Sequence, residues 1–76
     1  MGEIMNSYGH YIKEKRIEKG LSQEDVARRL HISQVTYGRY ELGVREVGVD
    51  MIFQIADALG VDVDEFFREM KVRYGD

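Results

Sequence analysis

Four residues with complementary chemistry lie close together between Gln34 and Leu42 of this 76-residue chain: Gln34, Val35, Gly38 and Arg39. At about 100° per residue, a helix over this segment would place all four on one side of its surface. Arg can donate two parallel hydrogen bonds to guanine, Gln can pair in the same bidentate way with adenine, and Val can pack against a thymine methyl group. Gly38 has no side chain, so the backbone can approach DNA closely there. The segment therefore has the chemistry of a helix that reads bases in the major groove.

The opposite side of the same helix carries Thr36, Tyr37 and Tyr40. We expect the two tyrosine rings to point into a core, with their hydroxyl groups at its edge. The helix thus has one side for packing and one for contact with a partner.

A second short helical pattern, residues 23–30, precedes this helix and must position it. Ser22 and Ser33 are the predicted N-caps of the two helices, and Gly43 is a left-handed stop after the second. Only three residues separate the two patterns. A break this tight predicts that the helices cross at a steep angle, as in a helix-turn-helix unit, rather than run antiparallel.

Apolar periodicity and end signals predict three further helices, at about residues 8–19, 49–59 and 63–70. Asn6 or Ser7 would cap the first of them and Asp62 the last, and a tail of residues 71–76 is expected to fray. We therefore predict an all-α fold, a compact five-helix bundle forming one domain over residues 1–76 with its core within residues 8–67.

Charge is unevenly distributed along the chain, although the net charge is only −3. Residues 13–45 carry eight basic and five acidic residues, whereas residues 46–67 carry six acids and no base. This predicts a basic face suited to DNA and an acidic face turned away from it. The chain has no Cys, which excludes disulfides and thiolate metal sites and fits a cytoplasmic protein, and no apolar run reaches the roughly 20 residues of a membrane span.

Several residues around the two short helices are candidates for phosphate contacts. Gln23 stands at the first turn of its helix, where backbone amides are also free to bind an anion. Ser33 and Thr36 are possible donors, with the alternative roles of an N-cap and of a hydroxyl bonded within its own helix. Arg45 is the only cation in the loop of residues 44–48.

Three motifs in order make the sequence resemble the phage-repressor and Cro type of helix-turn-helix domain, also called xenobiotic-response-element regulators. They are R-x-x-x-G-L-S-Q-E-D-V-A at 16–27, I-S-Q-V-T-Y-G-R-Y-E-L-G at 32–43 and I-A-D-A-L-G-V-D-V-D-E-F-F at 55–67. The resemblance implies a lambda-repressor-like fold that binds a double-stranded DNA operator as a homodimer, with residues 34–42 as recognition helix. It implies an ion pair between Arg16 and Glu41 beneath that helix. We assign the dimer interface to Phe66, Phe67 and Met70.

The chain departs from the family at a few positions. His31 stands at a turn position that needs a positive φ, where the family often has Gly or Asn, and Leu42 replaces a usual Asn. The predicted function is a sequence-specific transcriptional regulator, with repression favoured over activation.

Other function classes fit the sequence less well. His10 and His31 are the only histidines, and no motif for catalysis, a metal, a cofactor or a small-molecule ligand is present. The acids at Asp62, Asp64 and Glu65 lack the spacing of a calcium loop and fit a helix start better. Two alternatives stay open: a helical protein-interaction module with the same fold, and an antitoxin-type regulator that also binds a toxin.

Overall fold

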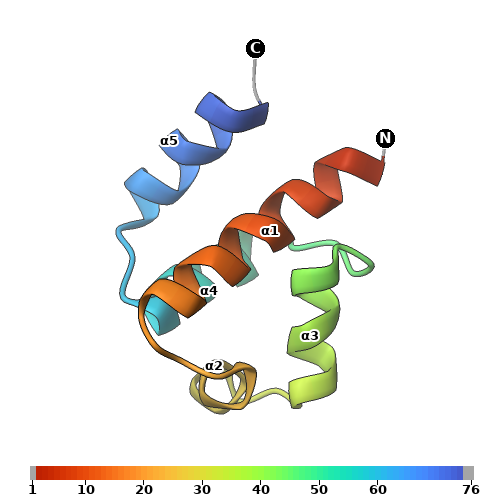
Figure 1. The fold of residues 1–76 in the computed structure, drawn as a ribbon, viewed down its shortest axis with the longest axis vertical. Coiled ribbons are helices and arrows are strands. Elements are labelled where there is room, and N and C mark those ends of the chain that lie inside the picture. The colour runs from red at the N-terminus through yellow and green to blue at the C-terminus, as the bar shows by residue number, and fades with distance from the viewer. Residues whose placement is uncertain (1, 75–76) are drawn as a thin grey trace.

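The computed structural model describes residues 2–74, and side chains for residues 8–73, as a bundle of five helices (Figure 1). The helices are α1 Gly2–Glu18, α2 Gln23–Leu30, α3 Gln34–Leu42, α4 Val49–Leu59 and α5 Val63–Tyr74. The all-helical prediction is confirmed, and the bounds of α2, α3 and α4 are those predicted from periodicity and caps. Within residues 2–74, no helix is long and apolar enough to cross a bilayer.

Local hydrogen bonds explain where α2 and α3 begin and end. The Ser22 hydroxyl accepts a bond from the amide of Asp25, whose carboxylate accepts one from the Ser22 amide, so a complete capping box starts α2. His31 ends α2 at φ 61°, the strained left-handed conformation expected at this turn. Ser33 caps α3, and α2 is seen nearly end-on while α3 stands upright (Figure 1), so the two helices cross steeply as predicted.

Two helix ends differ from the prediction. Helix α1 begins at Gly2, so Asn6 and Ser7 lie inside it instead of capping it. Asn and Ser favour N-caps, but a local preference of this kind is overridden where the surrounding structure continues the helix, and this signal was misleading here.

Helix α5 continues to Tyr74, so residues 71–74 are helical and not a frayed tail; residues 75 and 76 lie outside the described chain. The Arg73 guanidinium pairs with Glu14 of α1 at 2.6 Å and with Glu69 at 2.7 Å, and lies 5.2 Å from the centre of the Tyr11 ring. These contacts with α1 hold the last turn of α5 in place, which local sequence signals could not reveal.

Helix α1 crosses the domain diagonally, with α3 on one side and α5 on the other, and contacts both as well as α4 (Figure 1). Tyr11 and Ile12 of α1 are fully buried, and the Tyr11 ring meets Phe66 of α5 edge-on at 4.9 Å between ring centres. The predicted apolar stripes of α2 and α4 are buried in the same core: Val26, Ala27, Leu30, Ile52, Ile55, Ala56 and Leu59. Helix α3 packs against this core through one side only, so its other side is left at the surface.

Gly9 lets α1 approach α3 closely. A methyl group at this position would lie 2.5 Å from the carbonyl oxygens of both Tyr40 and Glu41. The absence of a side chain at Gly9 is therefore what sets the distance between α1 and the end of α3. This role of Gly9 has no signal in the sequence around it, because the carbonyl groups that it meets belong to another helix.

Candidate nucleic-acid interface

Helix α3 presents one polar face to solvent and buries the other. Gln34, Val35 and Arg39 are exposed, whereas Tyr37 and Tyr40 are buried in the core. The division between the faces is the one predicted, except that the Tyr37 hydroxyl is fully buried instead of reaching the core edge. The candidate base-reading side chains therefore lie together on a surface that nothing else in the domain covers.

The start of α3 is stabilised by two hydroxyl groups that bond to each other. The Ser33 hydroxyl donates to the Thr36 hydroxyl at 2.9 Å and accepts from the Thr36 amide at 3.1 Å. Ser33 is exposed and Thr36 is half-buried. Ser33 is thus the N-cap of α3, and the Thr36 hydroxyl bonds at the start of its own helix. A phosphate contact from either residue stays a prediction.

An ion pair beneath α3 joins three helices. Arg16 of α1 donates to the two carboxylate oxygens of Glu41 at 2.6 and 3.2 Å, and to the Leu21 carbonyl at 2.9 Å. Gln23 of α2 donates to the same carboxylate at 3.0 Å. The pair that the family resemblance implied is confirmed, and Gln23 is a third member that sequence analysis missed. Together they orient α3 against α1 and α2.

Electrostatics keep the Glu41 carboxylate ionised. Burial by itself would raise its pKa, but the hydrogen bonds from Arg16 and Gln23 outweigh burial and hold the pKa below the ordinary glutamate value. Burial, reinforced by the nearby Glu41 carboxylate, raises the pKa of Tyr37. The group under α3 is thus a charged carboxylate fully engaged with partners at neutral pH.

The Gln23 side chain lies between α2 and α3. Its amide oxygen lies 3.6 Å from the point where a methyl group on Gly38 would stand. Since its amide nitrogen donates to Glu41, the side chain bridges α2 to the outward face of α3. Its phosphate contact stays a prediction, and the bridge between α2 and α3 is a separate, structural role.

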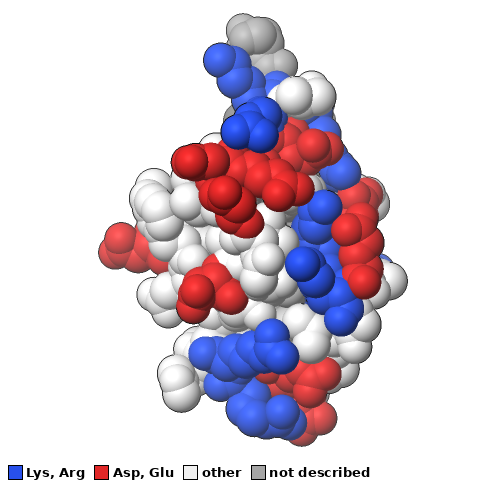
Figure 2. Space-filling view, turned by 90° about the vertical axis from the view of Figure 1, so that its left-hand side faces the viewer, with Lys and Arg blue, Asp and Glu red and all other residues white. Residues whose placement is uncertain are grey.

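Cations near α3 are left without acidic partners. Among the described side chains, Arg39 and Arg45 form no ion pair, and Arg45 lies 5.7 Å from the centre of the Tyr40 ring. The face away from α3, by contrast, shows acidic and basic clusters side by side (Figure 2). Among the cations that do have acidic partners, Lys15 pairs with Glu18 and Arg28 with Asp25, at 3.2 and 3.5 Å. Unpaired positive charge therefore lies where a polyanion would meet α3.

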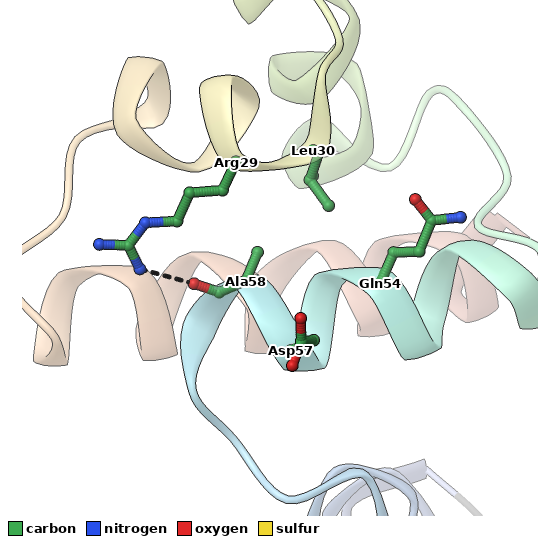
Figure 3. Close-up of a pocket in the computed structure, with 5 residues that line it drawn as sticks. All are labelled: Arg29, Leu30, Gln54, Asp57 and Ala58. Atoms are coloured by element: carbon green, nitrogen blue, oxygen red, sulfur yellow. Dashed lines mark hydrogen bonds between the residues drawn. The ribbon is translucent and has the colours of Figure 1, made fainter.

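A shallow pocket of about 380 Å³ lies between α2 and α4, lined by Arg29, Leu30, Gln54, Asp57 and Ala58 (Figure 3). Arg29 spans it and donates to the Ala58 carbonyl at 2.8 Å, which satisfies the C-terminal end of α4. Among the described residues no cluster of His, Cys, Asp or Glu could hold a metal ion. Arg29 thus has a structural role between α2 and α4.

Comparison with known proteins decides the family. The model of the Helix-turn-helix family matches residues 12–66, which is most of the chain. The chain belongs to this family. It is a DNA-binding helix-turn-helix regulator of the Cro/C1 type, and not an enzyme.

Individual relatives support the same assignment. The chain is 35% identical over 60 residues to an uncharacterized HTH-type transcriptional regulator, YqaF of Bacillus subtilis, covering 79% of each protein. The restriction-modification controller protein C.AhdI of Aeromonas hydrophila aligns with a TM-score of 0.77 and 31% identity, over 88% of this chain and all of that one. The clp gene regulator ClgR of C. glutamicum has the same fold, with a TM-score of 0.85 at 21% identity over 93% and 92% of the two chains. The chain spans only 58%, 53% and 53% of the lengths of three further curated relatives.

In this helix-turn-helix regulator the three residues assigned to the dimer interface differ in exposure. Phe66 is fully buried against Tyr11 and Met70 is also part of the core, so Phe67 is the exposed member of the three. Phe67 is exposed, and its ring meets exposed Phe53 of α4 edge-on at 6.1 Å between ring centres. Helical spacing places Phe66 and Phe67 about 100° apart. It could not tell which of the two faces the core, because that depends on how α5 packs against Tyr11 of α1.

Proposed function

We propose that this helix-turn-helix regulator binds a two-fold symmetric DNA operator as a homodimer, inserting α3 into the major groove. The observation that carries the proposal is the exposed face of α3, where Gln34, Val35 and Arg39 stand together beside unpaired positive charge. These side chains match the hydrogen-bonding and methyl patterns of base edges. A regulator that occupies DNA excludes other proteins from the same site, so we assign it the role of a repressor. We place this activity in the cytoplasm.

Contacts from α3 to bases are tested by alanine variants at Arg39 and Gln34. After selection of an operator from random duplexes, each variant is expected to bind it about 1–3 kcal/mol more weakly, or roughly 5- to 150-fold. Both side chains are exposed, so folding should not change. Titrations across a salt series separate base contacts from charge, because loss of one phosphate contact lowers the salt slope by about one.

The matched control is Arg68→Ala, which removes an exposed cation from α5. It should bind the operator as the parent does. If the Arg39 and Gln34 variants also bind like the parent, α3 is not the base-reading element.

The exposed aromatic pair Phe53 and Phe67 supports a protein-contact surface on α4 and α5. We assign this surface to the second copy of the chain, since the two-fold symmetric operator proposed above requires two copies. Their recognition helices would lie about 34 Å apart, which is one DNA turn. The Phe67→Glu variant is expected to sediment as a monomer and to bind the operator more weakly than the parent.

Val72→Glu introduces the same charge at another exposed position of α5 and is the control for that experiment. A Phe67→Glu variant that remains dimeric would remove this surface from the interface. A parent that is monomeric and captures no operator would favour the protein-interaction module over the regulator.

A further inference from the structure

The pocket between α2 and α4 contains two opposite charges that do not pair with each other. Arg29 of α2 and Asp57 of α4 both line it, and among the described side chains neither forms an ion pair. Figure 3 shows Arg29 at one end of the pocket, Gln54 at the other and Asp57 between them. Opposite charges that line one pocket without meeting leave room for a ligand that carries both charges.

Asp57 stands where a helix disfavours a carboxylate. It belongs to the last turn of α4, and that turn contains no basic residue. The negative end of the helix dipole lies there, so an acid at this position costs stability unless a cation binds it. No described side chain pairs with Asp57, so its exposed carboxylate is free to bind a positively charged group from outside the chain.

The Arg29 guanidinium is held in place and keeps donors to spare. One nitrogen donates to the Ala58 carbonyl at 2.8 Å, which fixes the group next to Asp57. A guanidinium has further N–H groups, and two of them can bind a carboxylate side by side. The lining also includes the apolar side chains of Leu30 and Ala58, both buried. The pocket thus offers an anion site, a cation site and an apolar contact.

We propose that this pocket binds a free α-amino acid with an aliphatic side chain. The ligand carboxylate accepts hydrogen bonds from Arg29, its ammonium group donates to Asp57, and its side chain packs against Leu30. The Gln54 amide can bond to either charged group. The volume of about 380 Å³ lies near the lower end of the range for small-molecule sites, roughly 300–1,000 Å³. A ligand bound in this way bridges α2 and α4 and stabilises the folded domain.

Titration of the isotope-labelled protein with leucine, followed by NMR, tests this proposal. Amide signals of the residues that line the pocket should shift, with a dissociation constant of about 1 mM, because a small ligand makes few contacts in a shallow pocket. At about 10 mM leucine the folding equilibrium constant from urea unfolding should rise about tenfold. Leucinamide lacks the carboxylate and N-acetylleucine lacks the ammonium group, and each should bind about tenfold more weakly or worse.

An asparagine variant at Asp57 removes the charge and keeps the shape of the side chain. Because an acid is unfavourable in the last turn of α4, Asp57→Asn should fold at least as well as the parent, and it should bind leucine about tenfold more weakly. Asp50→Asn makes the same change at an exposed position of α4 that does not line the pocket, and is the matched control. It should bind leucine as the parent does.

The other outcomes overturn the proposal. A parent whose amide signals do not respond to leucine, or respond only away from α2 and α4, does not bind an amino acid in this pocket. An Asp57→Asn variant that binds as tightly as the parent removes the cation site. Equal binding of leucine, leucinamide and N-acetylleucine would mean that neither charge is recognised. These measurements contain no DNA, so their failure leaves the proposed function intact.

Discussion

Replacing Glu41 by alanine is expected to lower the free energy of unfolding by about 3–5 kcal/mol, the usual cost of breaking a buried ion pair on one side. The Glu41 side chain is 2% exposed and that of Arg16 is 12% exposed, so the guanidinium would be left largely without water or a counter-ion. Gln23 would lose its acceptor as well. Urea unfolding at neutral pH, followed by circular dichroism, measures the loss.

A double variant separates the cost of an orphaned charge from the value of the pair. Replacing both residues, as Arg16→Met with Glu41→Leu, removes the uncompensated charge and should recover much of the lost stability. A Glu41→Ala protein within about 1 kcal/mol of the parent would contradict the expectation, because it would mean that the pair contributes little beyond a surface salt bridge.

The same network predicts how stability depends on pH. The folded pKa of Glu41 is lowered, so the carboxylate stabilises the fold above its unfolded pKa, about 4.3, and this contribution is lost as the pH falls through the lower folded value. The pKa values of Glu14 and Asp25 are also lowered, chiefly by hydrogen bonds with Arg73 and Ser22, and they add to the same acid sensitivity. In a Glu41→Gln variant the loss of stability below pH about 4.3 should be smaller than in the parent, and the difference between the two curves isolates Glu41.

Gly9→Ala is expected to destabilise the domain by about 1–3 kcal/mol or more, the range for added volume in a packed core. The new methyl group would stand 2.5 Å from two backbone carbonyl oxygens of α3, which cannot move aside as the end of a side chain can. Helices α1 and α3 would have to separate, which also disturbs the Arg16–Glu41 pair. Thermal and urea unfolding measure the effect, and weaker operator binding should accompany it.

Gly38→Ala makes the same chemical change in another helix interior and is the matched control. There the nearest atom to the new methyl group is the amide oxygen of Gln23 at 3.6 Å, an ordinary contact. This variant should gain about 1 kcal/mol because alanine favours the helix over glycine. Two glycine-to-alanine changes are thus expected to have opposite signs. If both stabilise, the close approach at Gly9 is not a constraint.

Sequence patterns were sufficient for much of the fold and for the face of α3. Capping residues and glycine stops depend on hydrogen bonds within a few residues, so Ser22, Ser33 and Gly43 marked the ends of α2 and α3 correctly. The split between Arg39 and Tyr40 followed from the helical repeat alone. The Arg16–Glu41 pair came from the family resemblance, since a pairing across 25 residues has no local signal.

Contacts between distant segments account for what the patterns missed. The length of α5 depends on Arg73 reaching Glu14 of α1, and the burial of Phe66 in place of Phe67 depends on where Tyr11 lies. Gly9 is constrained by carbonyl oxygens of α3 that lie more than thirty residues away in the chain. Local signals decide which residues form helices, where α2, α3 and α4 begin and end, and which side of each is apolar, because such energies arise between near neighbours. Only the folded chain brings α1, α3 and α5 to their distances, because packing and backbone approach arise between surfaces that meet in three dimensions.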